Sequence, residues 1–280
     1  LHRMLIMGAF IGLISFLIGG SMQWSGNTIP FYISIITFLL TCFMIPALPG
    51  SFNEVRGNGE LFPLNGPMWS LFFEYIGNIL YALFIRRLST KLLTLLVILL
   101  GILHSIFTIG NLSGYGNLGV GWTFDTINFC GGMLRMLFPF TLGMLISRCF
   151  KAIKLPYPFF LSSILLIATL SVPYLTAFKA INLNGIYESL CIIAIFPLIL
   201  IIGASNQEKS KLSQTLGELS YPLYIIHYPI MYLFYQWLIK TKQYTLSETY
   251  PVAILVVLLS VILAFTLSRL YDKPIRKRLH

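Results

Sequence analysis

Three side chains capable of acid, base or cationic chemistry stand inside long apolar stretches of this sequence: Glu74, Arg135 and His227. Ionisable groups are costly to bury in an apolar span, so each is a candidate functional residue. A histidine can take up a proton near neutral pH, and a carboxylate can orient it. An arginine in such a place needs a carboxylate or an anionic ligand such as phosphate. The pattern therefore favours an acid–base or anion-binding site.

The first polar pair consists of Ser70 and Glu74, which are four residues apart. This spacing places both side chains on one face of a helix. The Glu74 carboxylate could orient a base, bind a cation or pair with an arginine of another helix, and Arg135 is the candidate partner. A structural ion pair is the alternative interpretation for Glu74, and extension of the side chain toward the membrane interface is the alternative for Arg135.

The second polar group lies in the stretch from Gly217 to Pro229. Ser220, Tyr224 and His227 follow one another at i, i+4 and i+7, which predicts that they share one helix face. His227 on such a face could serve as a general base. The alternative interpretation is a histidine that only donates a hydrogen bond to a neighbouring helix.

Motifs of soluble enzymes and metal sites are absent from the chain. There is no G-x-S-x-G, phosphate-binding loop, H-E-x-x-H or dinucleotide fingerprint. The four cysteines form no C-x-x-C pair and are interpreted as small buried apolar residues, so we expect no metal site. They are Cys42, Cys130, Cys149 and Cys191.

Composition indicates how these residues are positioned. Of the 280 residues, 57% are hydrophobic and only 10% are charged, against about 25% charged in a soluble domain. We therefore predict an all-α, polytopic transmembrane helix bundle that forms a single domain with about nine membrane segments, embedded in a lipid bilayer. The predicted segments are residues 4–20, 29–48, 67–85, 92–109, 130–147, 157–175, 186–205, 216–239 and 250–270.

The basic residues predict the orientation of these segments. The net charge is +10, but the lysines and arginines gather between apolar segments, so we do not expect a nucleic-acid partner. Alternate loops rich in basic residues should face the cytoplasm, together with the C-terminus, and residues 49–66 and 110–129 should lie outside. The predicted cytoplasmic residues are Arg86, Arg87, Lys91, Arg148, Lys151, Lys154, Lys209, Lys211, Arg269, Lys273, Arg276, Lys277 and Arg278.

Four motifs occur in a fixed order over essentially the whole chain. They are Met68 to Leu71 with Glu74, Arg135 with Phe138, Phe140 and Gly143, Gly217 to Pro229, and Tyr271 to Arg276. Together they resemble the motifs of the integral-membrane acyltransferase 3 family, among them W-S-L-x-x-E, G-x-x-S-Y-x-L-Y-x-x-H-x-P and Y-[ED]-x-P-x-R. The late motif is the most specific of the four.

The resemblance implies a function and a set of site residues. Members of this family typically transfer an acyl group from a co-substrate such as acetyl-CoA, with no bound cofactor, to a hydroxyl group of a sugar, a cell-envelope polysaccharide or a small molecule. It implies an integral protein of the bacterial inner membrane. His227 and Glu74 would be catalytic, and the donor or substrate would be bound by Arg135, Ser70, Trp69, Tyr221, Tyr224 and Ser220.

One part of the family pattern has no counterpart here. The family carries a further N-terminal portion with an arginine motif and a histidine thought to be catalytic. We therefore expect residues 1–280 to be one acyltransferase-like domain that is incomplete at its N-terminus. If the family's N-terminal histidine is the principal catalytic residue, His227 has a secondary role. The alternatives are a transporter or flippase for acyl groups or lipid-linked sugars, and an inactive fragment.

Overall fold

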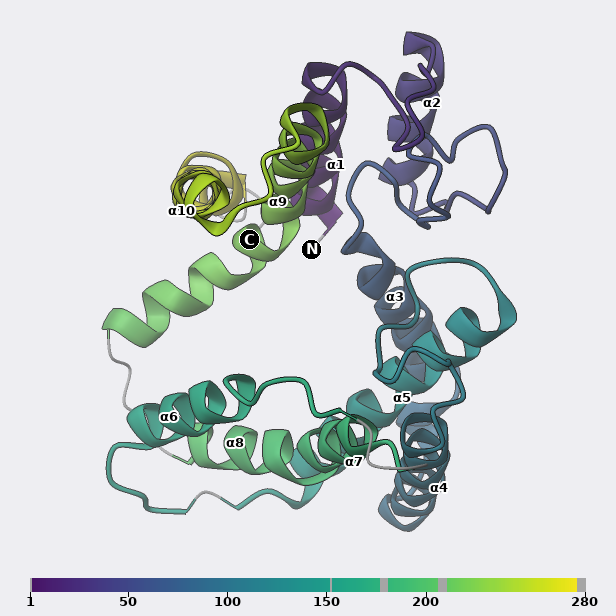
Figure 1. The fold of residues 1–280 in the computed structure, drawn as a ribbon. Coiled ribbons are helices and arrows are strands. Elements are labelled where there is room, and N and C mark those ends of the chain that lie inside the picture. Colours follow the sequence, from purple (N-terminus) through teal and green to yellow (C-terminus); the bar gives the residue numbers. More distant parts are fainter. Residues whose placement is uncertain (1, 152, 177–180, 206–210, 276–280) are drawn as a thin grey trace. The chain divides into compact units, whose positions relative to one another are not determined.

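The computed structural model describes residues 2–151, 153–176, 181–205 and 211–275. Its described part is helical, and its only β-type pairing consists of two isolated bridges. The α-helices (Figure 1) are α1 (His2–Ile18), α2 (Phe31–Cys42), α3 (Met68–Leu83), α4 (Thr90–Ile109), α5 (Thr126–Cys149), α6 (Pro158–Leu170), α7 (Leu183–Leu190), α8 (Phe196–Gly203), α9 (Lys211–Thr241) and α10 (Leu246–Leu267). Short 3-10 or π-helical turns are η1 (Ile85–Arg87), η2 (Cys191–Ile195) and η3 (Ser268–Asp272).

The all-α prediction is thus confirmed, whereas nine membrane segments are not. Among the described residues, four helical stretches are long and apolar enough to cross a membrane: Thr90–Ile109, Thr126–Cys149, Leu183–Gly203 and Leu246–Ile275. The predicted segment 29–48 shows the difference, because α2 has only 12 residues and so spans about 18 Å at 1.5 Å per residue. That length is short of the roughly 30 Å of a hydrocarbon core.

The chain divides into two compact units, each described by itself. The first comprises residues 1–69, 122–124 and 210–280, and the second residues 70–121 and 125–209. The prediction of a single domain is not tested by this division. Of the predicted cytoplasmic residues, Lys209, Arg276, Lys277 and Arg278 lie outside the described residues.

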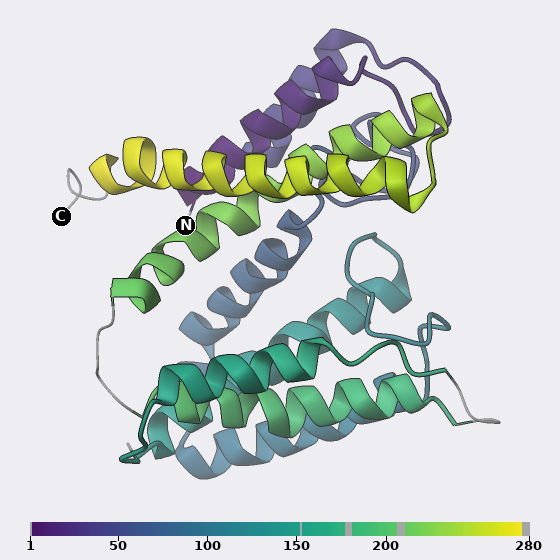
Figure 2. The ribbon, with the colours of Figure 1, turned by 60° about the vertical axis from the view of Figure 1, so that its left-hand side comes forward.

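In the first unit, α9 packs against both α1 and α10, and Figure 2 shows the three helices side by side. Glycines of α1 permit this close approach. A Cβ at Gly8 would lie 2.1 Å from Cγ2 of Ile225, and one at Gly12 would lie 2.1 Å from the Leu64 carbonyl oxygen. Such contacts between small residues and neighbouring backbone are typical of packed membrane helices.

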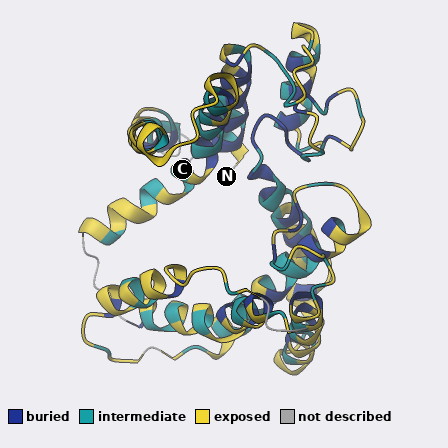
Figure 3. Ribbon diagram, viewed as in Figure 1, coloured by how far each residue is buried: buried dark blue, intermediate teal, exposed yellow. Residues whose placement is uncertain are grey.

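In the second unit, α4 packs against α5 and α7, and α6 packs against α8. Its apolar core includes Ile85, Leu93, Val97, Leu100 and Phe138. The opposite face of α4 is exposed and apolar, as on α10 of the first unit (Figure 3). A broad apolar exposed surface of this kind suits contact with lipid.

Helix α9 carries Pro222 and Pro229 in its interior. A proline has no backbone N–H, so Pro229 leaves the Ile225 carbonyl without its helical donor. The side-chain amide of Asn65 replaces that donor, with Nδ2 2.7 Å from the Ile225 oxygen. Asn65 is 0% exposed, so it stabilises the distorted helix and holds the segment before α3 against α9.

Replacing Asn65→Ala removes the donor and leaves a buried carbonyl group unpaired. We expect the free energy of unfolding to fall by about 1 to 3 kcal/mol. Thermal unfolding of the detergent-solubilised protein, followed by scanning fluorimetry, measures the change. Asn27→Ala is the matched control, because the Asn27 amide contacts only the exposed side chains of Gln23 and Ser25. Equal melting temperatures for the two variants would contradict this account of the helix.

Candidate active site

The segment just before α3 is tied to α9 by three further hydrogen bonds within the first unit. The Gly66 amide donates to the Tyr232 hydroxyl at 3.1 Å, and the Tyr224 hydroxyl donates to the Pro67 carbonyl at 2.9 Å. The Tyr232 hydroxyl in turn donates to the Glu60 carboxylate. The segment that leads into α3 is therefore held by Tyr224 of the late motif and by Tyr232, which lies three residues beyond that motif.

His227 has a defined tautomer in this arrangement. Its Nδ1 lies 2.9 Å from the Tyr224 carbonyl oxygen and 3.1 Å from the Leu223 carbonyl oxygen. Carbonyl oxygens only accept hydrogen bonds, so Nδ1 carries the proton in the neutral ring and Nε2 keeps its lone pair. An imidazole in this tautomer can accept a proton through Nε2.

Ser220, Tyr224 and His227 line one cavity of about 500 Å³ between α9 and α10, as their helical spacing predicts. The remaining lining residues are apolar except for one serine of α10: Leu223, Met231, Val256, Val257, Ser260 and Val261. The Ser220 hydroxyl donates to the Gly217 carbonyl at 2.9 Å. Tyr221 is not part of this lining.

The closing motif contacts the start of the late motif. Lys273 Nζ lies 2.6 Å from Oε2 of Glu218, with side chains 43% and 38% exposed respectively. A pair this exposed contributes little to stability. The Tyr271 hydroxyl donates to the Arg3 carbonyl at 3.5 Å. This motif therefore joins η3 to α9 and α1, and its Arg276 lies outside the described residues.

Arg135 belongs to the second unit, where its Nη1 donates to the Val120 carbonyl at 3.1 Å. It lines a cavity of about 490 Å³ together with apolar residues of α5, η2 and α8: Pro139, Leu142, Gly143, Ile146, Ile192, Phe196, Pro197 and Leu200. The pairing of Arg135 with Glu74 stays a prediction. A different carboxylate, Glu188, lies within electrostatic range of Arg135.

Glu188 is a functional candidate that sequence reasoning missed. Its carboxylate accepts a hydrogen bond from the Leu118 amide at 2.8 Å, close to the loop that Arg135 also contacts. The signal was the same as for Glu74, namely an acid inside a predicted membrane segment. Glu74 and Ser70 also belong to the second unit, on α3, whereas Trp69 belongs to the first.

Arg56 lies in the segment 49–66 that was predicted to face outward, yet it is 0% exposed. Its Nε donates to the Pro63 carbonyl at 2.6 Å, and its Nη1 and Nη2 make no hydrogen bond within the described residues. The guanidinium carbon lies 3.6 Å from the Tyr232 ring centroid and 5.1 Å from that of Trp24. Cation–π attraction to these rings therefore stabilises the buried charge.

Burial also acts on the two loop charges. It lowers the pKa of Arg56, while the fields of Tyr232 and Glu60 oppose that change. Burial raises the pKa of Glu60, and hydrogen bonds from Tyr232 and Asn58 and the field of Arg56 counteract it. The two groups thus support each other's charged form across one small region.

The described residues hold no cluster of three or more potential metal ligands among His, Cys, Asp and Glu. The interpretation of the cysteines is only partly correct. Cys191 is buried and Cys42 half-buried, whereas Cys130 and Cys149 are exposed, and all four are free. Exposed cysteines on apolar helices suit a surface that contacts lipid, because cysteine behaves as a small apolar residue.

Comparison with known proteins agrees with the motif pattern. Residues 2–269 match the family model of the acyltransferase 3 type, described as an acyltransferase domain. No curated protein and no solved structure matches the chain. The matched region begins in α1, contains α9 with its histidine, and ends in η3. With apolar helices long enough to cross a bilayer and a family match over nearly its whole length, the chain belongs to the acyltransferase 3 family of integral membrane proteins.

Proposed function

We propose that this protein is a membrane O-acyltransferase that moves an acyl group, such as acetyl, from acyl-CoA to a hydroxyl group of a sugar, a cell-envelope polysaccharide or a small molecule. The observation that carries the proposal is the geometry of His227. Its Nδ1 faces two carbonyl oxygens at 2.9 and 3.1 Å, so Nε2 is the ring nitrogen that can take up a proton.

In the proposed reaction, Nε2 of His227 removes the proton of the acceptor hydroxyl group. The resulting oxygen attacks the thioester carbonyl carbon, and the bond from that carbon to the CoA sulfur breaks. The protonated imidazole then returns its proton to the thiolate. The largely apolar lining of the His227 cavity supports this role, because exclusion of water limits hydrolysis of the thioester.

The donor is proposed to be bound through Arg135. A guanidinium group suits the phosphates of CoA, and Arg135 lines a cavity of about 490 Å³. Glu74, Ser70, Trp69 and Tyr221 keep supporting roles in this proposal on the strength of their places in the family motifs.

The proposed setting is the inner membrane of a bacterial cell, with about nine membrane segments and a cytoplasmic C-terminus. The acyl donor would then arrive from the cytoplasm, while the loops 49–66 and 110–129 face outward. The charge distribution supports this orientation, because the apolar segments are flanked by basic residues in alternate loops.

Replacing His227→Ala removes the proposed proton acceptor. We expect acyl transfer in the native full-length protein to fall about 10²- to 10⁴-fold. The readout is the O-acetyl content of cell-surface glycans, with the release of free CoA in membranes that are supplied with acetyl-CoA. His2→Ala is the control for loss of a histidine, since His2 is exposed and lies outside this cavity. Wild-type transfer by His227→Ala at matched expression would remove this residue from the reaction.

The orientation can be tested separately in a bacterial host. Alkaline phosphatase fused after His280 should be inactive, because alkaline phosphatase folds only outside the cytoplasm. A fluorescent protein fused at the same position should be bright. Phosphatase inserted after Gly114, whose surroundings are open, should be active. The reverse pattern of activities would place the C-terminus outside.

A further inference from the structure

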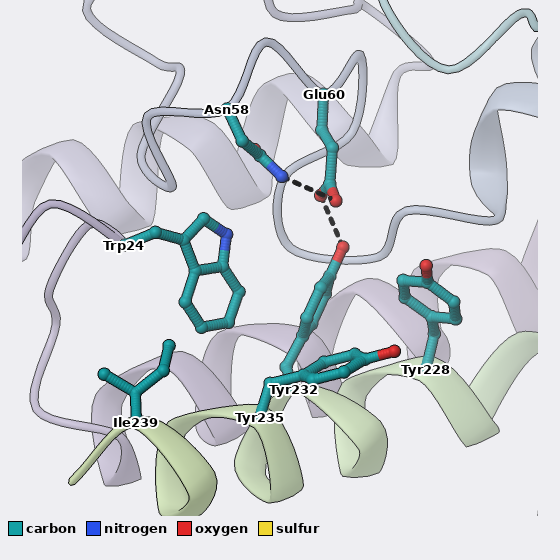
Figure 4. Close-up of a pocket in the computed structure, with 7 residues that line it drawn as sticks. All are labelled: Trp24, Asn58, Glu60, Tyr228, Tyr232, Tyr235 and Ile239. Atoms are coloured by element: carbon teal, nitrogen blue, oxygen red, sulfur yellow. Dashed lines mark hydrogen bonds between the residues drawn. The ribbon is translucent and has the colours of Figure 1, made fainter. Parts of the chain in front are cut away.

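A second cavity of the first unit is lined by three tyrosines of α9 and by two loops. Its volume is about 330 Å³, at the lower end of the roughly 300 to 1,000 Å³ of small-molecule sites. Figure 4 shows the side chains that surround it: Trp24, Asn58, Glu60, Tyr228, Tyr232, Tyr235 and Ile239. None of these residues belongs to the motifs that carried the family resemblance except Tyr228.

The helix supplies the aromatic wall. Tyr228, Tyr232 and Tyr235 follow at i, i+4 and i+7, so they share one face of α9. Tyr232 meets Tyr228 and Trp24 at centroid distances of 5.0 and 6.0 Å. Tyr228 also touches His227, with ring centroids 5.6 Å apart. Tyr228 therefore both lines the cavity and contacts the ring of the proposed proton acceptor.

Polar groups also line this cavity and can form hydrogen bonds to a ligand. The Glu60 carboxylate is held by the Tyr232 hydroxyl and by Asn58 Nδ2, which lies 3.0 Å from Oε1 (Figure 4). The hydroxyl groups of Tyr228 and Tyr235 and the indole N–H of Trp24 make no hydrogen bond among the described residues. A ligand can thus meet both donors and acceptors here.

The charge of the cavity selects a neutral ligand. Glu60 is the only residue of the lining that carries a carboxyl, amino, guanidinium or imidazole group, and Arg56 lies close enough for its field to act on that carboxyl group. The Arg56 guanidinium already stacks on the rings of Tyr232 and Trp24. An organic cation in the cavity would therefore contact two rings that already interact with a cation. An anion would be repelled by Glu60.

We propose that this cavity binds a neutral sugar ring and so serves as the docking site of the acceptor. The C–H face of a sugar packs on aromatic rings, while its hydroxyl groups bond to carboxylate, amide and phenol groups. Its role as an acceptor site rests on the proposed acyltransferase function; binding of the sugar does not. The position of the Glu60 loop, in the segment predicted to face outward, suits an acceptor on the outer side.

The test is equilibrium binding to the purified full-length chain in detergent, with no acyl donor present. The neutral probes are the methyl glycosides of glucose, galactose, mannose and N-acetylglucosamine. Their binding is measured by saturation-transfer NMR and by the change in tryptophan fluorescence. Tetramethylammonium and glucuronate represent cations and anions. We expect saturable binding of at least one neutral glycoside. Absence of binding by all four, or binding of only a charged probe, would overturn the proposal.

Two variants of exposed lining residues locate the site. Tyr235→Ala and Asn58→Ala should each weaken binding of the glycoside by about tenfold or more, since each removes a direct contact. Tyr244→Ala is the matched control, because Tyr244 is 66% exposed and outside the lining. Unchanged binding in both pocket variants, with all proteins equally folded by thermal unfolding, would move the sugar elsewhere and reject this site.

The same proteins separate this inference from the proposed function. If the glycoside binds and both pocket variants lose it, but no acyl transfer is found, the binding site stands and the acyltransferase proposal fails. If transfer proceeds at the wild-type rate in Tyr235→Ala and Asn58→Ala, the acyltransferase proposal stands and the acceptor site fails.

Discussion

The stacking of the Arg56 guanidinium on the Tyr232 ring is the contact on which the arrangement of the first unit depends. Burying an arginine of which two nitrogens make no hydrogen bond to the described residues is costly, and the aromatic rings and the nearby Glu60 carboxyl group compensate for it. The Tyr232 hydroxyl then binds both Glu60 and the Gly66 amide. One tyrosine of α9 thereby holds the loop that precedes α3, and both the candidate sugar cavity and the start of the W-S-L-x-x-E helix follow from it.

Helix α9 presents two different chemical faces. One carries Ser220, Tyr224 and His227 toward α10, and the other carries the tyrosines that meet Trp24 and Glu60. Pro229 lies within the second group, between Tyr228 and Tyr232, and Asn65 donates to the Ile225 carbonyl that this proline leaves without its helical donor.

In the second unit, Arg135 and Glu188 both contact one short loop. Arg135 reaches the Val120 carbonyl, and Glu188 accepts from the Leu118 amide, so the two charges meet the same short loop from α5 and α7. This arrangement orders the loop and keeps an opposite charge near the guanidinium.

The sequence by itself determined the helical character, the membrane setting and the family, because hydrophobic length and motif order are local properties of the chain. It also predicted that Ser220, Tyr224 and His227 share a face, since helical periodicity requires only their spacing. The sequence predicted the lengths of individual helices less well, because α2 ends at Cys42 and the predicted segment ends at residue 48.

Only the tertiary structure decided the roles of Arg56, Glu60 and Asn65. Asn65 and Ile225 are 160 residues apart in the chain, and Glu60 and Tyr232 are 172 apart. The sequence around a polar loop residue does not show which distant residue it will contact. Arg56 therefore could not be distinguished from a solvent-exposed charge in a loop. The burial of Arg56 and the hydrogen bond from Asn65 to the Ile225 carbonyl depend on which segments pack together, and the local sequence does not show this.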